Sequence, residues 1–169
     1  MARSRPHMAS LLATCGPLGH IPMAPGTWGS LPGIPLAIGI HELVRSQTGE
    51  QWPALFFTGL AAVCLLLVPG CLSIIRRTEA HWGTHDDKRI VIDEVLGMVL
   101  TLVWFPPTPA VLVLGFALFR LFDIWKPWPV REIDQQWPGA LGTLFDDVVA
   151  GLMAAVVIAL IPASWLALF

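Results

Sequence analysis

The chain has 169 residues, of which 55% are hydrophobic and 13% charged, and its mean hydropathy is +0.68. A soluble globular domain carries about 25% charged residues, and a disordered chain carries more charge and less apolar surface, so the composition excludes both classes. It predicts an integral membrane protein, and the length predicts one domain, residues 1–169. The net charge of −2 does not bear on nucleic acid binding, but the sequence has no basic stripe with interleaved aromatic residues, so we expect no nucleic acid partner.

Five apolar segments predict membrane-associated helices; in chain order they are residues 31–44, 54–75, 90–105, 110–124 and 148–169. The second and the last each hold 22 residues without a charge, and a span needs about 20. The first is weaker, because Pro32 and Pro35 interrupt it. The third and fourth form a hairpin broken by Pro106, Pro107 and Pro109. We therefore expect an all-α, multi-pass membrane bundle with about four to five membrane-associated helices.

The basic residues predict the orientation of this bundle. Alternating spans place residues 1–30, 76–89 and 120–147 on one side of the membrane. That side holds nine of the ten Lys and Arg residues, and the tenth is Arg45. Cytoplasmic loops carry the excess of basic residues, so we expect this side to face the cytoplasm.

Three carboxylate clusters from three predicted helices lie at this same face: Asp93 with Glu94, Asp123, and Asp146 with Asp147. Carboxylates at a membrane edge are costly unless they are paired, and they usually indicate function. Clustered carboxylate oxygens suit Mg²⁺, whose ligand shell a substrate phosphate completes. The clusters therefore predict a Mg²⁺ site that binds a phosphate.

Each cluster also has a structural interpretation. Asp146 and Asp147 open the predicted last span, where negative charges favour the helix N-terminus. The pair at 93–94 is alternatively a solvated pair. In residues 81–87, His85 and Asp86 are possible metal ligands, although a hydrated loop is the simpler interpretation.

Basic and hydroxyl side chains near the clusters are candidate phosphate contacts. Arg120 and Lys126 flank Asp123 at helical spacing, so they bind phosphate oxygens or form an ion-pair ladder along one helix face. The Gly- and Pro-rich segment 19–30 offers the hydroxyls of Thr27 and Ser30, which suits an anion site or a plain turn at the membrane entry.

Four motifs occur in order along the chain: Pro-x-Ala-Pro-Gly-Thr-x-Gly-Ser at 22–30, Ile-Asp-Glu-x-x-Gly-Met at 92–98, Arg-x-x-Asp-x-x-Lys-Pro-x-Pro at 120–129, and Asp-Asp-x-x-Ala-Gly at 146–151. Together they resemble bacterial phosphatidylglycerophosphatase A. The resemblance implies a Mg²⁺-dependent, multi-pass enzyme of the bacterial inner membrane. Such an enzyme removes the terminal phosphate of the membrane phospholipid phosphatidylglycerophosphate and yields phosphatidylglycerol.

The clusters and the resemblance together predict the roles of the site residues. The expected catalytic and metal-binding residues are Asp93, Glu94, Asp123, Asp146 and Asp147, and the expected substrate contacts are Thr27, Ser30, Arg120 and Lys126. Asp134 belongs to no motif and has no expected role.

We expect metal-assisted phosphomonoester hydrolysis in which a carboxylate activates water, and an aspartyl-phosphate intermediate is equally compatible with the sequence. The alternative function is a small ion or lipid transporter, but that class places charges near mid-span rather than at one edge.

Overall fold

The computed structural model describes residues 8–48, 53–85, 87–162 and 166. Over these residues the chain forms eight α-helices, one short 3-10 helix and no β-strand, which confirms the predicted all-α class. In chain order the elements are α1 (Met8–Ala13), η1 (Leu18–His20), α2 (Pro25–Ser30), α3 (Gly33–Thr48), α4 (Pro53–Trp82), α5 (Ile92–Leu102), α6 (Pro109–Trp125), α7 (Val130–Gln136) and α8 (Ala140–Ala159).

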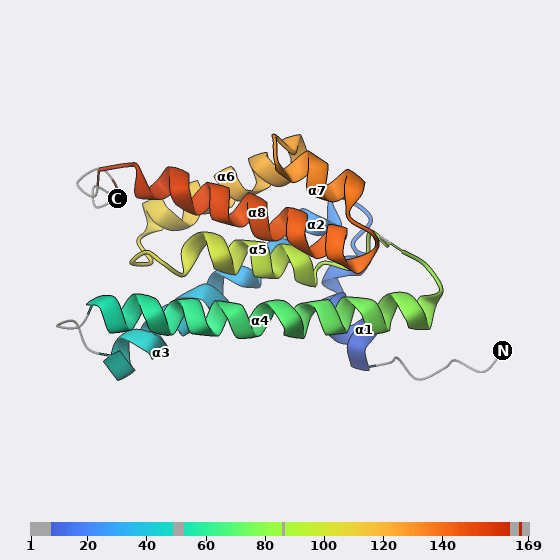
Figure 1. Ribbon diagram of the computed structural model, residues 1–169, viewed down its shortest axis with the longest axis horizontal. Helices are drawn as coiled ribbons and strands as arrows, with labels where there is room; N and C mark the ends of the chain where they lie inside the picture. Colours follow the sequence, from blue (N-terminus) through green and yellow to red (C-terminus); the bar gives the residue numbers. More distant parts are fainter. Residues whose placement is uncertain (1–7, 49–52, 86, 163–165, 167–169) are drawn as a thin grey trace.

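Helix α5 lies in the middle of the bundle, between α8 and α6 on one side and α3 and α4 on the other (Figure 1). Every residue from Val95 to Leu102 is buried, and so is Asp93. Its 11 residues are about 16 Å long, which is too short to cross a hydrocarbon core of about 30 Å. The helix is therefore a buried support for the elements around it.

Helices α5 and α8 approach each other closely because both carry a glycine at the contact. A Cβ atom on Gly151 would lie 2.3 Å from the carbonyl oxygen of Gly97, and one on Gly97 would lie 2.9 Å from the carbonyl oxygen of Asp147. Small residues at such contacts let helix backbones approach in membrane proteins. The close approach brings the backbone of Asp147 against the helix that carries Asp93.

Among the described residues, two helices are long and apolar enough to cross a membrane, α4 with 30 residues and α8 with 20. The predicted span 54–75 lies inside α4. Helix α8 covers the predicted span 148–169 only as far as Ala159, and residues 163–165 and 167–169 of that span lie outside the described chain. Helices α3 and α6 have 16 and 17 residues. The larger count of four to five membrane-associated helices stays a prediction.

The proline-broken hairpin is confirmed as α5 and α6, where the Thr108 hydroxyl caps the second helix by accepting a hydrogen bond from the Val111 N–H at 3.3 Å. The predicted start of the last helix is wrong. Helix α8 begins at Ala140, eight residues before the predicted 148, because its first turns pack their apolar side chains into the bundle. Asp146 and Asp147 are thus its seventh and eighth residues and do not mark its N-terminus.

The segments predicted on one side of the membrane gather at one end of the bundle (Figure 1). Helices α1, α2 and α7, the ends of α4 and α6, and the starts of α5 and α8 lie there. The end of α3, the start of α4 and the α5–α6 connection lie at the opposite end. The four motifs therefore meet at one place in space.

Candidate functional site

A polar cavity of about 280 Å³ opens at this end, between α2, α5, α6, α7, α8 and the segment before α5. All five predicted carboxylates line it, and so do both predicted basic residues, Arg120 and Lys126. The structure thus brings together side chains from three of the four motifs, and the backbone of the fourth.

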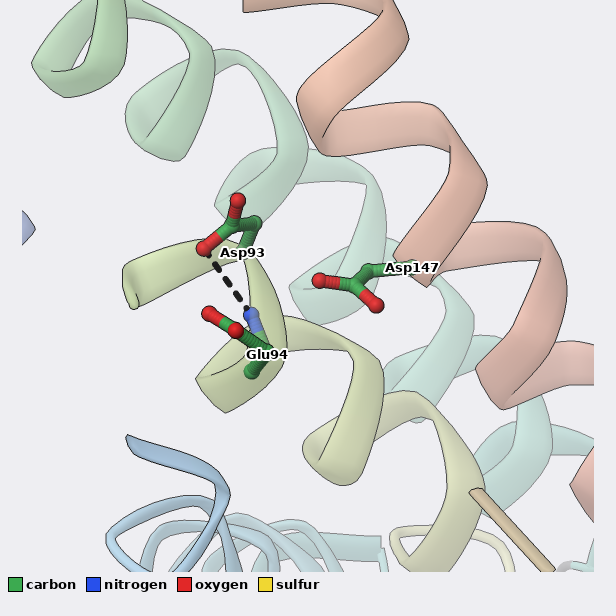
Figure 2. A group of neighbouring side chains, drawn as sticks. All are labelled: Asp93, Glu94 and Asp147. Carbon is green, nitrogen blue, oxygen red and sulfur yellow. Dashed lines mark hydrogen bonds between the residues drawn. The ribbon is translucent and has the colours of Figure 1, made fainter. Parts of the chain in front are cut away.

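Asp93 and Glu94 on α5 face Asp147 on α8, and Figure 2 shows the three side chains pointing toward one another. One oxygen from each carboxylate lies within 4.8 Å of the others. Asp93 and Asp147 are each 4% exposed. The Glu94 N–H donates to Asp93 Oδ1 at 3.2 Å, which fixes the first carboxylate at the start of α5. We call these three residues the carboxylate trio.

Two oxygens of the trio are left unsatisfied by the protein. Glu94 Oε2 and Asp147 Oδ1 are buried and accept no hydrogen bond within the described part of the chain. Buried acceptors without a partner are costly, and three neighbouring carboxylates repel one another. A divalent cation removes both costs, and Mg²⁺ takes oxygen ligands of this kind. The trio fits a Mg²⁺ ion.

Arg120 is held between two helices at the cavity wall. Its Nη1 forms an ion pair with Asp123 one turn further along α6, and it lies 3.4 Å from the Ser30 hydroxyl on α2. That hydroxyl donates to the Gly26 carbonyl at 2.7 Å, so α2 fixes the hydroxyl that meets the guanidinium. The Arg120 Nε is buried and has no partner among the described residues.

Lys126 ends α6 in the left-handed conformation, with φ at 47°. Its Nζ donates to Asp146 Oδ2 and to Asp134 Oδ1, each at 2.6 Å. Burial alone lowers the pKa of Lys126, but the two hydrogen-bonded carboxylates outweigh it and raise the pKa above its ordinary value. The ammonium is therefore charged at neutral pH and links α6, α7 and α8.

Segment 19–30 contributes through its backbone more than through its hydroxyls. Ala24, Pro25 and Gly26 line the cavity, whereas Thr27 and Ser30 do not. A Cβ atom on Gly26 would lie 2.4 Å from Glu94 Oε1 and 3.2 Å from the Arg120 guanidinium, so any other residue here would require the Glu94 side chain or α2 to shift. Ser30, predicted as a substrate contact, is fully buried, and its hydroxyl accepts a hydrogen bond from Arg120 Nη1 at 3.4 Å.

Of the two possible metal ligands of the loop, the structure describes only His85, and it does not join the site. His85 is exposed, and its Nδ1 lies 3.5 Å from Glu79 Oε2 outside the cavity lining. Asp86 lies outside the described residues.

Sequence reasoning missed Asp87, Lys88 and Asp134, which all line the cavity. Arg89 holds Asp87 with hydrogen bonds of 2.8 and 2.7 Å, and these lower the pKa of Asp87. The signal for Asp134 is the proline-rich turn after Lys126, which reverses the chain and returns α7 to the cavity.

Comparisons with known proteins agree with the motifs. A family model described as Phosphatidylglycerophosphatase A matches residues 11–162. Phosphatidylglycerophosphatase A of Escherichia coli K12 is 34% identical over 98% of this chain and 91% of its own length. The protein of the same name from Haemophilus influenzae is 39% identical, over 88% of this chain and 85% of its own length.

A third relative, from Bacteroides thetaiotaomicron, is provisionally named a phosphatidylinositol-3-phosphatase and is 34% identical over 87% of each chain. No solved structure matches the chain. The family match spans every residue named above as lining the cavity. The chain is therefore an enzyme, a phosphatase that belongs to the phosphatidylglycerophosphatase A family.

Proposed function

We propose that this chain hydrolyses the terminal phosphomonoester of phosphatidylglycerophosphate, in a Mg²⁺-dependent reaction at the cytoplasmic face of the bacterial inner membrane. The products are phosphatidylglycerol and inorganic phosphate. The observation that carries the proposal is the buried carboxylate trio with two unsatisfied oxygens, beside two cationic side chains in one cavity. The names of two relatives support the choice of substrate.

The trio of Asp93, Glu94 and Asp147 would hold the Mg²⁺ ion. When bound, the ion neutralises charge on the phosphate oxygens and makes phosphorus more open to attack. Arg120 and Lys126 bind the remaining phosphate oxygens, since a guanidinium and an ammonium both donate charge-assisted hydrogen bonds. Asp123 and Asp146 keep these two cations in place in the absence of substrate.

Hydrolysis forms a bond between a water oxygen and phosphorus and breaks the bond from phosphorus to the glycerol oxygen. A carboxylate takes the proton that the water loses, and the resulting carboxyl group gives it to the departing glycerol oxygen, which leaves as an alcohol. Asp123 and Asp146 line the cavity beside the trio without belonging to it, so we assign the water's proton to one of them. Retention of labelled phosphate by acid-quenched enzyme would instead indicate attack by an aspartate.

Phosphate release from phosphatidylglycerophosphate by the purified protein in detergent tests the function. We expect release with Mg²⁺, loss of release when EDTA removes the ion, and recovery when Mg²⁺ is added back. Equal release with Mg²⁺ and with EDTA would contradict the metal dependence. No release under any condition, from protein that keeps its helical content, would contradict the function.

The orientation rests on charge. Seven described basic residues lie at the cavity end of the bundle, namely Arg76, Arg77, Lys88, Arg89, Arg120, Lys126 and Arg131, whereas Arg45 lies near the end of α3 at the other. With the native cysteines replaced, the exposed Gln135 on α7 is changed to Cys and treated with a membrane-impermeant thiol reagent. We expect no reaction in intact cells and full reaction after lysis; reaction in intact cells would contradict the cytoplasmic orientation.

A further inference from the structure

A second cavity, apolar and about 450 Å³ in volume, lies on the other side of α5 from the carboxylate trio. Helices α1, α3, α4 and α5 form its walls, with Leu12, Leu36, Leu66 and Val99 among the lining side chains. We call this cavity the apolar groove. Nothing in the hydrolysis of a phosphomonoester requires it.

The groove begins beside the catalytic cavity. Ile92, the first residue of α5, lines the groove, and the next two residues, Asp93 and Glu94, line the catalytic cavity. Cys15 lies on the groove wall. The two cavities therefore adjoin each other at the start of α5.

The groove then follows the helix axes away from the site. On α5 it extends from Ile92 to Val99, about 10 Å, and on the antiparallel α4 from Ile74 to Leu66, about 12 Å. In Figure 1 this direction points from the cavity end of the bundle toward its middle. A hydrocarbon chain attached to a headgroup at a membrane edge takes the same direction into the bilayer.

The position of the groove separates it from the other apolar cavities. One is lined by Phe56 and Trp104, and another by Phe105 and Ile158. Both lie toward the opposite end of α5. Along this helix, the distance from Asp93 to Leu102 is nine residues, or about 14 Å. A molecule with its phosphate at the trio therefore meets the apolar groove first.

One wall of the groove, at Gly70, borders open space. A Cβ atom on Gly70 of α4 would meet no atom within 4 Å, and Leu66 one turn away is 75% exposed. The walls come from four separate helices, so the groove is a shaped site and not the outer surface of a single span. Volumes of about 300–1,000 Å³ with mostly apolar walls are typical of sites for small molecules.

We propose that the apolar groove binds one acyl chain of the phospholipid substrate and so selects a lipid-anchored phosphomonoester over a water-soluble one. The proposal rests on the proposed function, since it places the substrate phosphate at the trio. The affinity comes from transferring methylene groups into the groove, and the α5 N-terminus fixes the distance between chain and phosphate.

Filling the groove tests this directly. Gly70→Trp places an indole in the open space, and Gly39→Trp is the matched control, because Gly39 also lies inside a helix with no atom within 4 Å of an added Cβ but lines none of the cavities described above. Each variant is assayed on long-chain phosphatidylglycerophosphate and on its deacylated headgroup. The measured quantity is the ratio of the two kcat/KM values.

We expect wild-type enzyme to favour the long-chain substrate, and Gly70→Trp to lower that ratio at least about tenfold through KM, since losing about two buried methylene groups suffices for this. Gly39→Trp is expected to keep the ratio. An unchanged ratio in Gly70→Trp, or a wild-type ratio near one, would overturn the groove proposal. Absence of turnover on both substrates in the wild type would instead overturn the proposed function.

Photo-cross-linking supplies a readout that needs no turnover. A phosphatidylglycerophosphate with a diazirine in one acyl chain is irradiated with wild-type protein, and the labelled residues are mapped. We expect labels at Leu12, Leu66 and Cys71, displaced by excess unlabelled lipid. Labels spread over lipid-exposed side chains such as Val113, without displacement, would overturn specific binding in the groove.

Discussion

The two ends of helix α5 both bury polar side chains, but only one end satisfies them. At the far end the Thr101 hydroxyl donates to the Gly97 carbonyl at 2.9 Å, His41 Nδ1 lies 2.9 Å from the Val103 carbonyl, and Trp104 Nε1 donates to the Leu100 carbonyl at 2.7 Å. At the cavity end an oxygen of Glu94 and one of Asp147 have no partner within the described chain. Buried polar groups are normally hydrogen-bonded, so we interpret the satisfied end as structural and propose that the unsatisfied end binds a ligand.

The largest effect expected from this difference follows loss of charge in the trio. Asp93→Asn and Asp147→Asn keep side-chain volume but remove a carboxylate, so turnover should fall by at least about 100-fold, the scale of a lost metal contact or acid–base group. The measurement is phosphate release per mole of purified protein. The control is Glu132→Gln, an exposed acid on α7 outside the trio. Equal turnover in all three variants would contradict a functional difference between the two ends of α5.

A single methyl group at the cavity end should have the next largest effect. Gly26→Ala puts a carbon 2.4 Å from Glu94 Oε1, so either the carboxylate or α2 must move. A displacement of about 1 Å in a catalytic group costs up to about 100-fold in rate, and we expect a loss of about 10- to 100-fold. Gly39→Ala, where the added carbon meets nothing, is the control for turnover. Full activity in Gly26→Ala would show that the close approach has no role in catalysis.

The cations at the cavity should affect binding more than turnover. Lys126→Ala is expected to raise KM about tenfold, because hydrogen bonds to charged groups are worth about 1.5–3 kcal/mol. Asp134→Asn should raise KM less than about fivefold, since its side chain is 37% exposed and such ion pairs are weak. Steady-state kinetics on the same substrate separate the two parameters. A fall in kcat with KM unchanged in Lys126→Ala would assign the lysine to the chemical step.

The smallest effect on turnover is expected at the satisfied end. Thr101→Val keeps the shape of the side chain but removes the hydroxyl that bonds to Gly97, so the free energy of unfolding should fall by about 1 kcal/mol. Turnover at a temperature where the protein is folded should not change. Thermal unfolding in detergent gives the stability, and the phosphate assay gives the rate. A turnover loss as large as in the trio variants would contradict a purely structural far end.

The order of apolar segments and prolines in the sequence predicts most of the helices, because these helix boundaries depend on residues close by in the chain. Prolines at 106, 107 and 109 end one helix and begin the next, and the long uncharged run at 54–75 lies inside α4. The start of α8 was not predictable in the same way. In the sequence, Asp146 and Asp147 indicate a polar helix end. In the fold, the close glycine contact between α5 and α8 buries both side chains, and α8 begins six residues before Asp146.

The site was predictable as a set of residues and not as a geometry. The apolar neighbours of Asp93 and Glu94 in the sequence indicate that these side chains are buried. The three carboxylate clusters are predicted at the same membrane face, which indicates that they meet in one site. Nothing local indicates that Asp147 completes the trio while Asp146 binds Lys126, since this depends on the rotation of α8. Asp134 belongs to no motif, and it could not be predicted as a site residue because its contact with Lys126 forms only when α7 folds back.

Divalent cation binding to the purified protein tests the central claim most directly, because it needs neither substrate nor turnover. Mn²⁺ serves as a paramagnetic substitute for Mg²⁺, and its electron paramagnetic resonance signal reports the free ion during titration. We expect the wild type and Glu132→Gln to bind Mn²⁺ and release it to excess Mg²⁺, and Asp147→Asn to bind it at least about tenfold more weakly, as loss of a ligand requires. Equal binding by wild type and Asp147→Asn would contradict a metal site at the carboxylate trio.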